Sequence, residues 1–115
     1  MNFNTDNIGS LEPRLISNYF ESLKGQFFKI LPMTENREPS RFIHIDSFLT
    51  ELMGADSLID SIHCDARFLS LIAVLKYFSD HPDLDAKTVR REVFKACTIC
   101  DTLAKAYSGA DKGVS

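Results

Sequence analysis

Apolar residues recur at spacings of three and four along the chain, and this periodicity predicts four amphipathic helices. In the first, Pro13 suits the opening turn and Pro32 marks the predicted end. Gly25, inside this helix, indicates either a close approach of another helix or a tolerated surface glycine. The apolar stripe of this helix consists of Leu15, Ile16, Tyr19, Phe20, Leu23, Phe27, Ile30 and Leu31.

The second predicted helix begins at Ser40, whose side chain can cap it, and ends at Gly54. Residues 55–65 then form a short helical turn and a connection, and Asp65 caps the third helix. The third helix covers residues 67–78 and stops in the sequence DHPDLD. The stripe of the second helix consists of Phe42, Ile45, Phe48, Leu49, Leu52 and Met53.

The fourth predicted helix extends from about Ala86 to Tyr107. Its stripe consists of Val89, Val93, Ala96, Cys100, Leu103 and Tyr107, widened by Cys97 and Ala104. The β-branched runs and the alternation of period two that strands need are absent from the sequence. We therefore expect an all-α fold, a compact bundle of four main helices plus one short helical turn. It forms a single domain over residues 12–107, between a flexible segment at 1–11 and a flexible tail at 108–115.

The third predicted helix contains the sequence RFLSLIAVLKYF, which is apolar in nearly every direction around the helix axis. A helix that is apolar all round is normally buried all round, whereas a helix of a four-helix bundle is exposed on its outer side. This helix therefore lies in the centre of an irregular bundle, or is covered by a partner or a second copy, or leaves an exposed patch without a role. The residues predicted to contact a partner are Phe68, Leu71, Val74 and Phe78.

The composition, with 44% hydrophobic and 25% charged residues, is that of a soluble globular protein. The formal net charge of −3 argues against general binding to nucleic acid or to membrane surfaces. The first ten residues lack the regions of a signal peptide, and no apolar run approaches the ~18 residues of a membrane span. We therefore expect a cytoplasmic protein that does not enter a membrane.

Charge is distributed unevenly along the chain. Acidic residues dominate between Arg41 and Asp65, whereas basic residues outnumber acidic ones in the fourth helix. Lys87, Arg91 and Lys95 are spaced four apart and line one helix face, where they could form the charged border of an interaction surface. They could also be a solvated face or a site for an anion or a nucleic-acid phosphate, although no RNA-binding motif accompanies them.

Two of the three cysteines form the motif Cys97-Thr-Ile-Cys100. Its place deep inside a predicted helix disfavours redox chemistry, which needs a thiol at a helix N-terminus. Zinc binding would require four ligands, and the candidate set is His63, Cys64, Cys97 and Cys100. The simpler interpretation is that Cys97 and Cys100 are reduced, buried core residues.

No catalytic motif stands out. His63, Cys64 and Asp65 have the residue types of a thiol nucleophile, a base and an acid, but adjacent side chains rarely point toward one another. No nucleophile elbow, phosphate-binding glycine loop or di-iron motif occurs. We therefore expect no enzyme and no cofactor.

The function that the sequence favours is a non-enzymatic protein–protein interaction module, a small helical subunit or adaptor that joins a protein partner or itself. The alternatives are a zinc-binding helical domain and a module that binds an anion or nucleic acid through the basic residues of the fourth helix.

Overall fold

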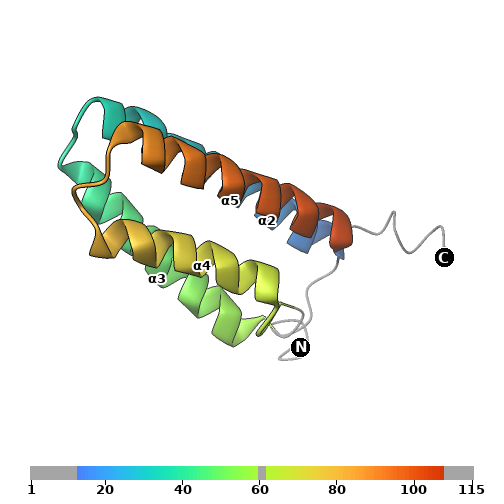
Figure 1. Ribbon diagram of the computed structural model, residues 1–115. Coiled ribbons are helices and arrows are strands. Elements are labelled where there is room, and N and C mark those ends of the chain that lie inside the picture. The colour runs from blue at the N-terminus through green and yellow to red at the C-terminus, as the bar shows by residue number, and fades with distance from the viewer. Residues whose placement is uncertain (1–12, 60–61, 108–115) are drawn as a thin grey trace.

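A computed structural model describes residues 13–59 and 62–107 and confirms the predicted all-α bundle of four helices (Figure 1). The predicted flexible segments at 1–11 and 108–115 lie outside the described residues. No strand occurs in the described part of the chain. The helices are α2 (Pro13–Glu35), α3 (Ser40–Leu58), α4 (Ala66–Asp80) and α5 (Ala86–Ala106).

The helices form two layers, with α2 beside α5 in one layer and α3 beside α4 in the other (Figure 1). Consecutive helices are antiparallel, so the chain runs up and down the bundle. The contact between α2 and α5 is the most extensive, and α4 packs against both α3 and α5. The first and last described helices therefore close the bundle against each other.

The predicted apolar stripes meet in one core that extends through the whole bundle. At one end, the Phe20 ring of α2 lies 6.1 Å from Phe68 of α4 and 5.7 Å from Tyr107, which follows α5. Toward the other end, the rings of Phe27 and Phe48 pack edge to face at 4.8 Å and join α2 to α3. Aromatic pairs of this kind contribute about 0.5–1.5 kcal/mol beyond the area that they bury.

The predicted end of the first helix at Pro32 is wrong, because α2 continues for another turn to Glu35. Proline removes only one N–H from the helix, the one that would donate to the carbonyl four residues earlier. Pro32 lies on an exposed face of α2, where water can bind that carbonyl instead. The Pro32 carbonyl still accepts from the Asn36 N–H at 2.9 Å.

The helix ends instead at Glu35, and in the turn that follows Arg37 adopts a left-handed conformation with φ of 53°. The Arg37 N–H donates to the Thr34 carbonyl at 3.1 Å, and the Glu38 N–H donates to the Met33 carbonyl at 2.9 Å. These two hydrogen bonds form the Schellman motif that commonly ends helices, here with arginine in the position that usually holds glycine.

The predicted end of the second helix at Gly54 is also wrong, because α3 continues to Leu58. Ser40 is the first residue of α3, and Pro39 before it makes no side-chain capping bond. Residues 55–58 of the segment predicted as a separate helical turn and connection thus extend α3, and a hydrogen-bonded turn at 62–64 follows. Residues 60 and 61 lie outside the description.

The predicted start of the third helix is confirmed. The Asp65 carboxylate accepts from the Arg67 N–H at 2.8 Å and caps α4. The same carboxylate accepts from the Tyr107 hydroxyl at 2.8 Å and pairs with the Arg67 guanidinium at 3.0 Å. Asp65 therefore ties the beginning of α4 to the end of α5.

The hydrogen bonds from Arg67, together with that from Tyr107, lower the pKa of Asp65 from 3.8 to about 2. A lowered folded-state pKa means that ionised Asp65 stabilises the fold above pH 4 and that this stability is lost as the pH falls through about 2. We predict that Asp65→Ala lowers the free energy of unfolding by about 1–2 kcal/mol, since it removes a helix cap as well as the Tyr107 partner.

Asp65→Asn is the matched control, because asparagine still caps a helix but carries no charge. Urea unfolding at several pH values should show that the difference in stability between the wild type and Asp65→Asn is constant above pH 4 and narrows as the pH falls toward 2. A difference independent of pH would contradict the role of the ionised carboxylate.

The close helix approach considered for Gly25 is not present. A Cβ atom built at Gly25 meets nothing within 4 Å, and the residue is exposed, so the surface-glycine interpretation holds. Gly54 also has open space around the Cβ position.

We predict that Gly25→Ala raises the free energy of unfolding by about 0.5–1 kcal/mol, because alanine reduces the conformational freedom of the unfolded chain and meets no obstacle in the helix. Gly54→Ala should have an effect of the same sign. Thermal or urea unfolding measures both, and a loss of stability in Gly25→Ala would show a close contact at this position.

Candidate functional site

The residues predicted to contact a partner lie in the core. Phe68, Leu71, Val74 and Phe78 are exposed by 0%, 0%, 6% and 3% respectively. A partner could reach them only if the bundle opened. Burial in the bundle core explains these four side chains, although α4 is one of four similarly placed helices and does not lie in the centre of an irregular bundle.

Burial of α4 is extensive but not complete. Ile72 and Leu75 are also buried, so six apolar residues of this helix face the core. Its outer side carries Leu69, which is 41% exposed, together with Ser70, Ala73 and Lys76. The apolar run is thus explained by packing of α4 against both α3 and α5, and a modest apolar strip remains outside.

The basic residues predicted on the fourth helix lie on the surface of α5. Arg91 and Lys95 share Glu92, with N···O distances of 3.6 and 3.7 Å. Lys87 has no ion-pair partner within the described residues. The structure therefore brings the three cations to one exposed helix surface, although it does not bring them to the four apolar residues.

An exposed aromatic pair lies between α2 and α5. Phe28 of α2 and Phe94 of α5 are 37% and 49% exposed, and their rings pack edge to face at 5.9 Å. By contrast, Phe20, Phe27, Phe48, Phe68 and Phe78 are buried. The signal that could have identified the pair is that both residues fall outside the predicted apolar stripes of their helices.

Ion pairs flank the aromatic pair at both ends. Arg90 bonds Glu35 at 3.0 Å, and Lys24 bonds Asp101 at 2.8 Å. Both bridges join α5 to α2. We call Phe28, Phe94 and these two ion pairs the aromatic surface.

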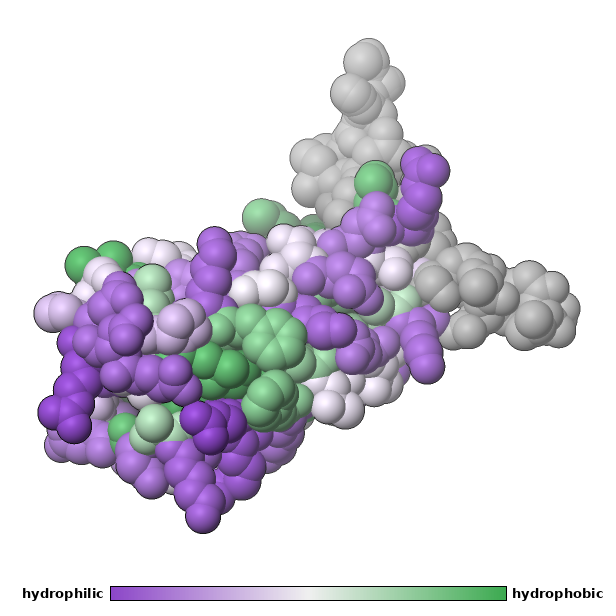
Figure 2. All heavy atoms as spheres, turned by 90° about the horizontal axis from the view of Figure 1, so that it is seen from above, coloured by the Kyte–Doolittle hydropathy of each residue, from purple (hydrophilic) through white to green (hydrophobic). Residues whose placement is uncertain are grey.

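Figure 2 looks onto this layer of the bundle from above and shows apolar side chains gathered near the middle, surrounded by hydrophilic ones. An apolar centre with a polar border is the arrangement typical of a protein contact surface.

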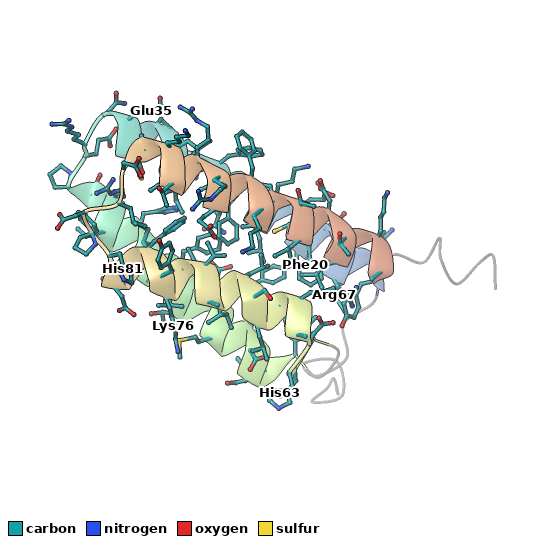
Figure 3. The ribbon with its side chains drawn as sticks, in the orientation of Figure 1. Phe20, Glu35, His63, Arg67, Lys76 and His81 are labelled. Carbon is teal, nitrogen blue, oxygen red and sulfur yellow. The ribbon has the colours of Figure 1, made fainter. Side chains whose placement is uncertain are left out.

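The candidate zinc ligands do not come together. No group of three or more metal-binding side chains occurs within the described residues, which include all four candidates. His63 lies at the end of the α3 and α4 layer, away from α5 (Figure 3). Cys97 and Cys100 face the core, as the simpler interpretation expected.

The environment of these residues disfavours thiol chemistry. Burial raises the pKa of Cys97 to about 11 and that of Cys100 to about 12. His63 places Nδ1 2.8 Å from the Asp56 carbonyl oxygen, and the Cys64 N–H donates to the Asp56 carboxylate at 3.0 Å. Asp56 therefore orders this turn, and no hydrogen bond joins His63 to the Cys64 thiol in the described structure.

We predict that a thiol reagent modifies only Cys64 in the folded protein, since Cys64 is exposed and the other two cysteines are buried. Ellman's reagent should show one fast thiol in the native state and three in denaturant. The Cys64→Ser variant should show none that react quickly. Fast reaction in that variant would mean that α5 opens readily.

Two half-open spaces lie at one end of the bundle. A cavity of about 10 Å³ lies among Ile30, Phe78 and Val89 and could hold about one water molecule. An open groove at the same end of the bundle runs between the two connections, and its charged residues have both signs, among them Glu38, Arg41 and Asp83. Neither space gathers the residues of a catalytic site.

None of the helices in the described part of the chain is both long and apolar enough to cross a membrane. No family model matches the chain, no curated protein matches it in sequence, and no solved structure matches it.

Proposed function

We propose that this protein is a non-enzymatic protein–protein interaction module, a small helical subunit or adaptor that contacts its partner through the aromatic surface. The observation that carries the proposal is the exposed ring pair of Phe28 and Phe94 on a bundle that buries most of its other phenylalanines. Large aromatic side chains supply contact area at low entropic cost, and they are enriched at the energetic centres of interfaces.

The position of the contact differs from the one that the sequence suggested. The four residues suggested by the sequence are buried in the core and stabilise the bundle: Phe68, Leu71, Val74 and Phe78. The proposed contact surface lies on α2 and α5 instead. Lys87, Arg91 and Lys95 keep their suggested role as a charged border, now beside Phe94. The proposal keeps the predicted cytoplasmic location, which suits an exposed free thiol at Cys64.

Two features of the ring pair favour a role in binding. Its members come from helices that are far apart in sequence, so the pair exists only in the folded protein. The ion pairs at either end restrict the long side chains beside the rings, which reduces the ordering that binding would require. The surface is thus partly organised before a partner arrives.

We predict that a photo-crosslinking residue in place of Thr98, an exposed position one turn after Phe94, gives a discrete adduct in the cells that make the protein. Phe94→Ser should reduce the yield by about tenfold or more, because truncation of a central aromatic residue removes much of the binding energy. The adduct yield is measured on immunoblots of the tagged chain.

The matched control places the crosslinker at Ser47, an exposed residue of α3 in the other layer. Circular dichroism of Phe94→Ser should show an intact bundle, since the side chain is half exposed. An adduct at Thr98 that survives Phe94→Ser, or equal adducts at Thr98 and Ser47, would contradict the proposal.

A further inference from the structure

The aromatic surface has the length of a short helix. The contacts of Glu35 with Arg90, Phe28 with Phe94 and Lys24 with Asp101 mark successive levels along it. From Arg90 to Asp101 the helix rises about 16 Å at 1.5 Å per residue. A shallow hollow lined by Ser17, Glu21, Asp101, Ala104 and Lys105 continues it toward the other end. A partner helix of about four turns would span the whole surface.

The secondary structure of the surface restricts how a partner can bind. Helices satisfy their backbone hydrogen bonds internally, so α2 and α5 offer no free edge to which an extended peptide could add as a strand. Binding must use side chains, and the groove between two packed helices accepts the side-chain ridge of a third helix. Gly25, one turn before Phe28, has open space at its Cβ position and leaves room for that ridge.

The charges around the rings are predominantly positive. Lys29 and Lys87 have no ion-pair partner within the described residues, and Arg91 and Lys95 share Glu92. The Glu92 side chain is only 16% exposed. Glu35 and Asp101 are also exposed, but Arg90 and Lys24 pair with them, so the charge left over beside the rings is positive. This excess favours an acidic partner and disfavours a second copy that presents the same cations.

From these observations we infer that the aromatic surface binds an amphipathic helix of another protein, with an apolar stripe over Phe28 and Phe94 and acidic side chains beside it. The acidic side chains would pair with Lys87 and Arg91 on one side and with Lys29 on the other. This inference rests on the proposed function and specifies the partner's chemistry.

The experiment is a selection of helical peptides against the purified full-length protein. The displayed library consists of helices of about fifteen residues with a constant apolar stripe and flanks randomised among Glu, Lys and Ser. Enriched peptides are synthesised, and fluorescence anisotropy measures their affinity for the wild type and for Phe94→Ser and Arg91→Glu.

We expect enrichment of Glu in the flanks. Phe94→Ser and Arg91→Glu should each weaken binding by about tenfold or more, and added salt should weaken binding of the Glu-flanked peptides to the wild type. Binders that depend on Phe94 but carry Lys or no preferred charge in the flanks would overturn the acidic-helix inference and leave the aromatic surface as a contact site. Enriched binders indifferent to Phe94→Ser, or no enrichment, would overturn both proposals.

A second variant separates binding from folding. Gly25→Gln should stabilise the bundle, because glutamine favours a helix over glycine, while its side chain intrudes on the docking groove and weakens peptide binding. Ile43→Ser, at a 71% exposed position on α3, should leave binding unchanged. Sedimentation of the protein alone tests whether a second copy of the chain covers the aromatic surface. A dimer that Phe94→Ser dissociates would identify a second copy on this surface and overturn the acidic-helix inference.

Discussion

The packing of α2 against α5 is the contact on which the rest of the bundle depends. These are the first and last described helices, and their contact is the most extensive between any two elements. The contact holds α2 and α5 together as one layer, and this layer covers the apolar stripes of α3 and α4 (Figure 1). Because it joins residues far apart in the chain, closing it costs more loop entropy than a contact between consecutive helices.

The same contact creates the surface to which we assign function. Antiparallel pairing aligns Phe28 with Phe94 on the outer side of the layer, where no other described helix covers them. The ion pairs of Arg90 with Glu35 and Lys24 with Asp101 lie at matching levels across the same two helices. Their partly exposed positions imply a modest contribution to stability, and their stronger effect is to hold side chains in place around the rings.

Burial in the bundle core explains most of the apolar character of α4. Like each of the other described helices, α4 packs against two neighbours, and six of its residues are buried in that packing. Loss of one large side chain there would leave a cavity and destabilise the monomer. Excess hydrophobicity in one helix of a small domain is therefore weak evidence for an interface unless the opposite face is shown to be exposed.

The sequence by itself determined the all-α class, the existence of four helices, the cap at Asp65 and the burial of Cys97 and Cys100, because these depend on local periodicity and capping chemistry. It placed helix ends at Pro32 and Gly54 incorrectly, since both residues can continue a helix where solvent or open space accommodates them. Only the tertiary structure decided which apolar residues are exposed. A stripe reveals that a helix has an inner face, but the pairing of α2 with α5 determines that Phe28 and Phe94 meet outside that face.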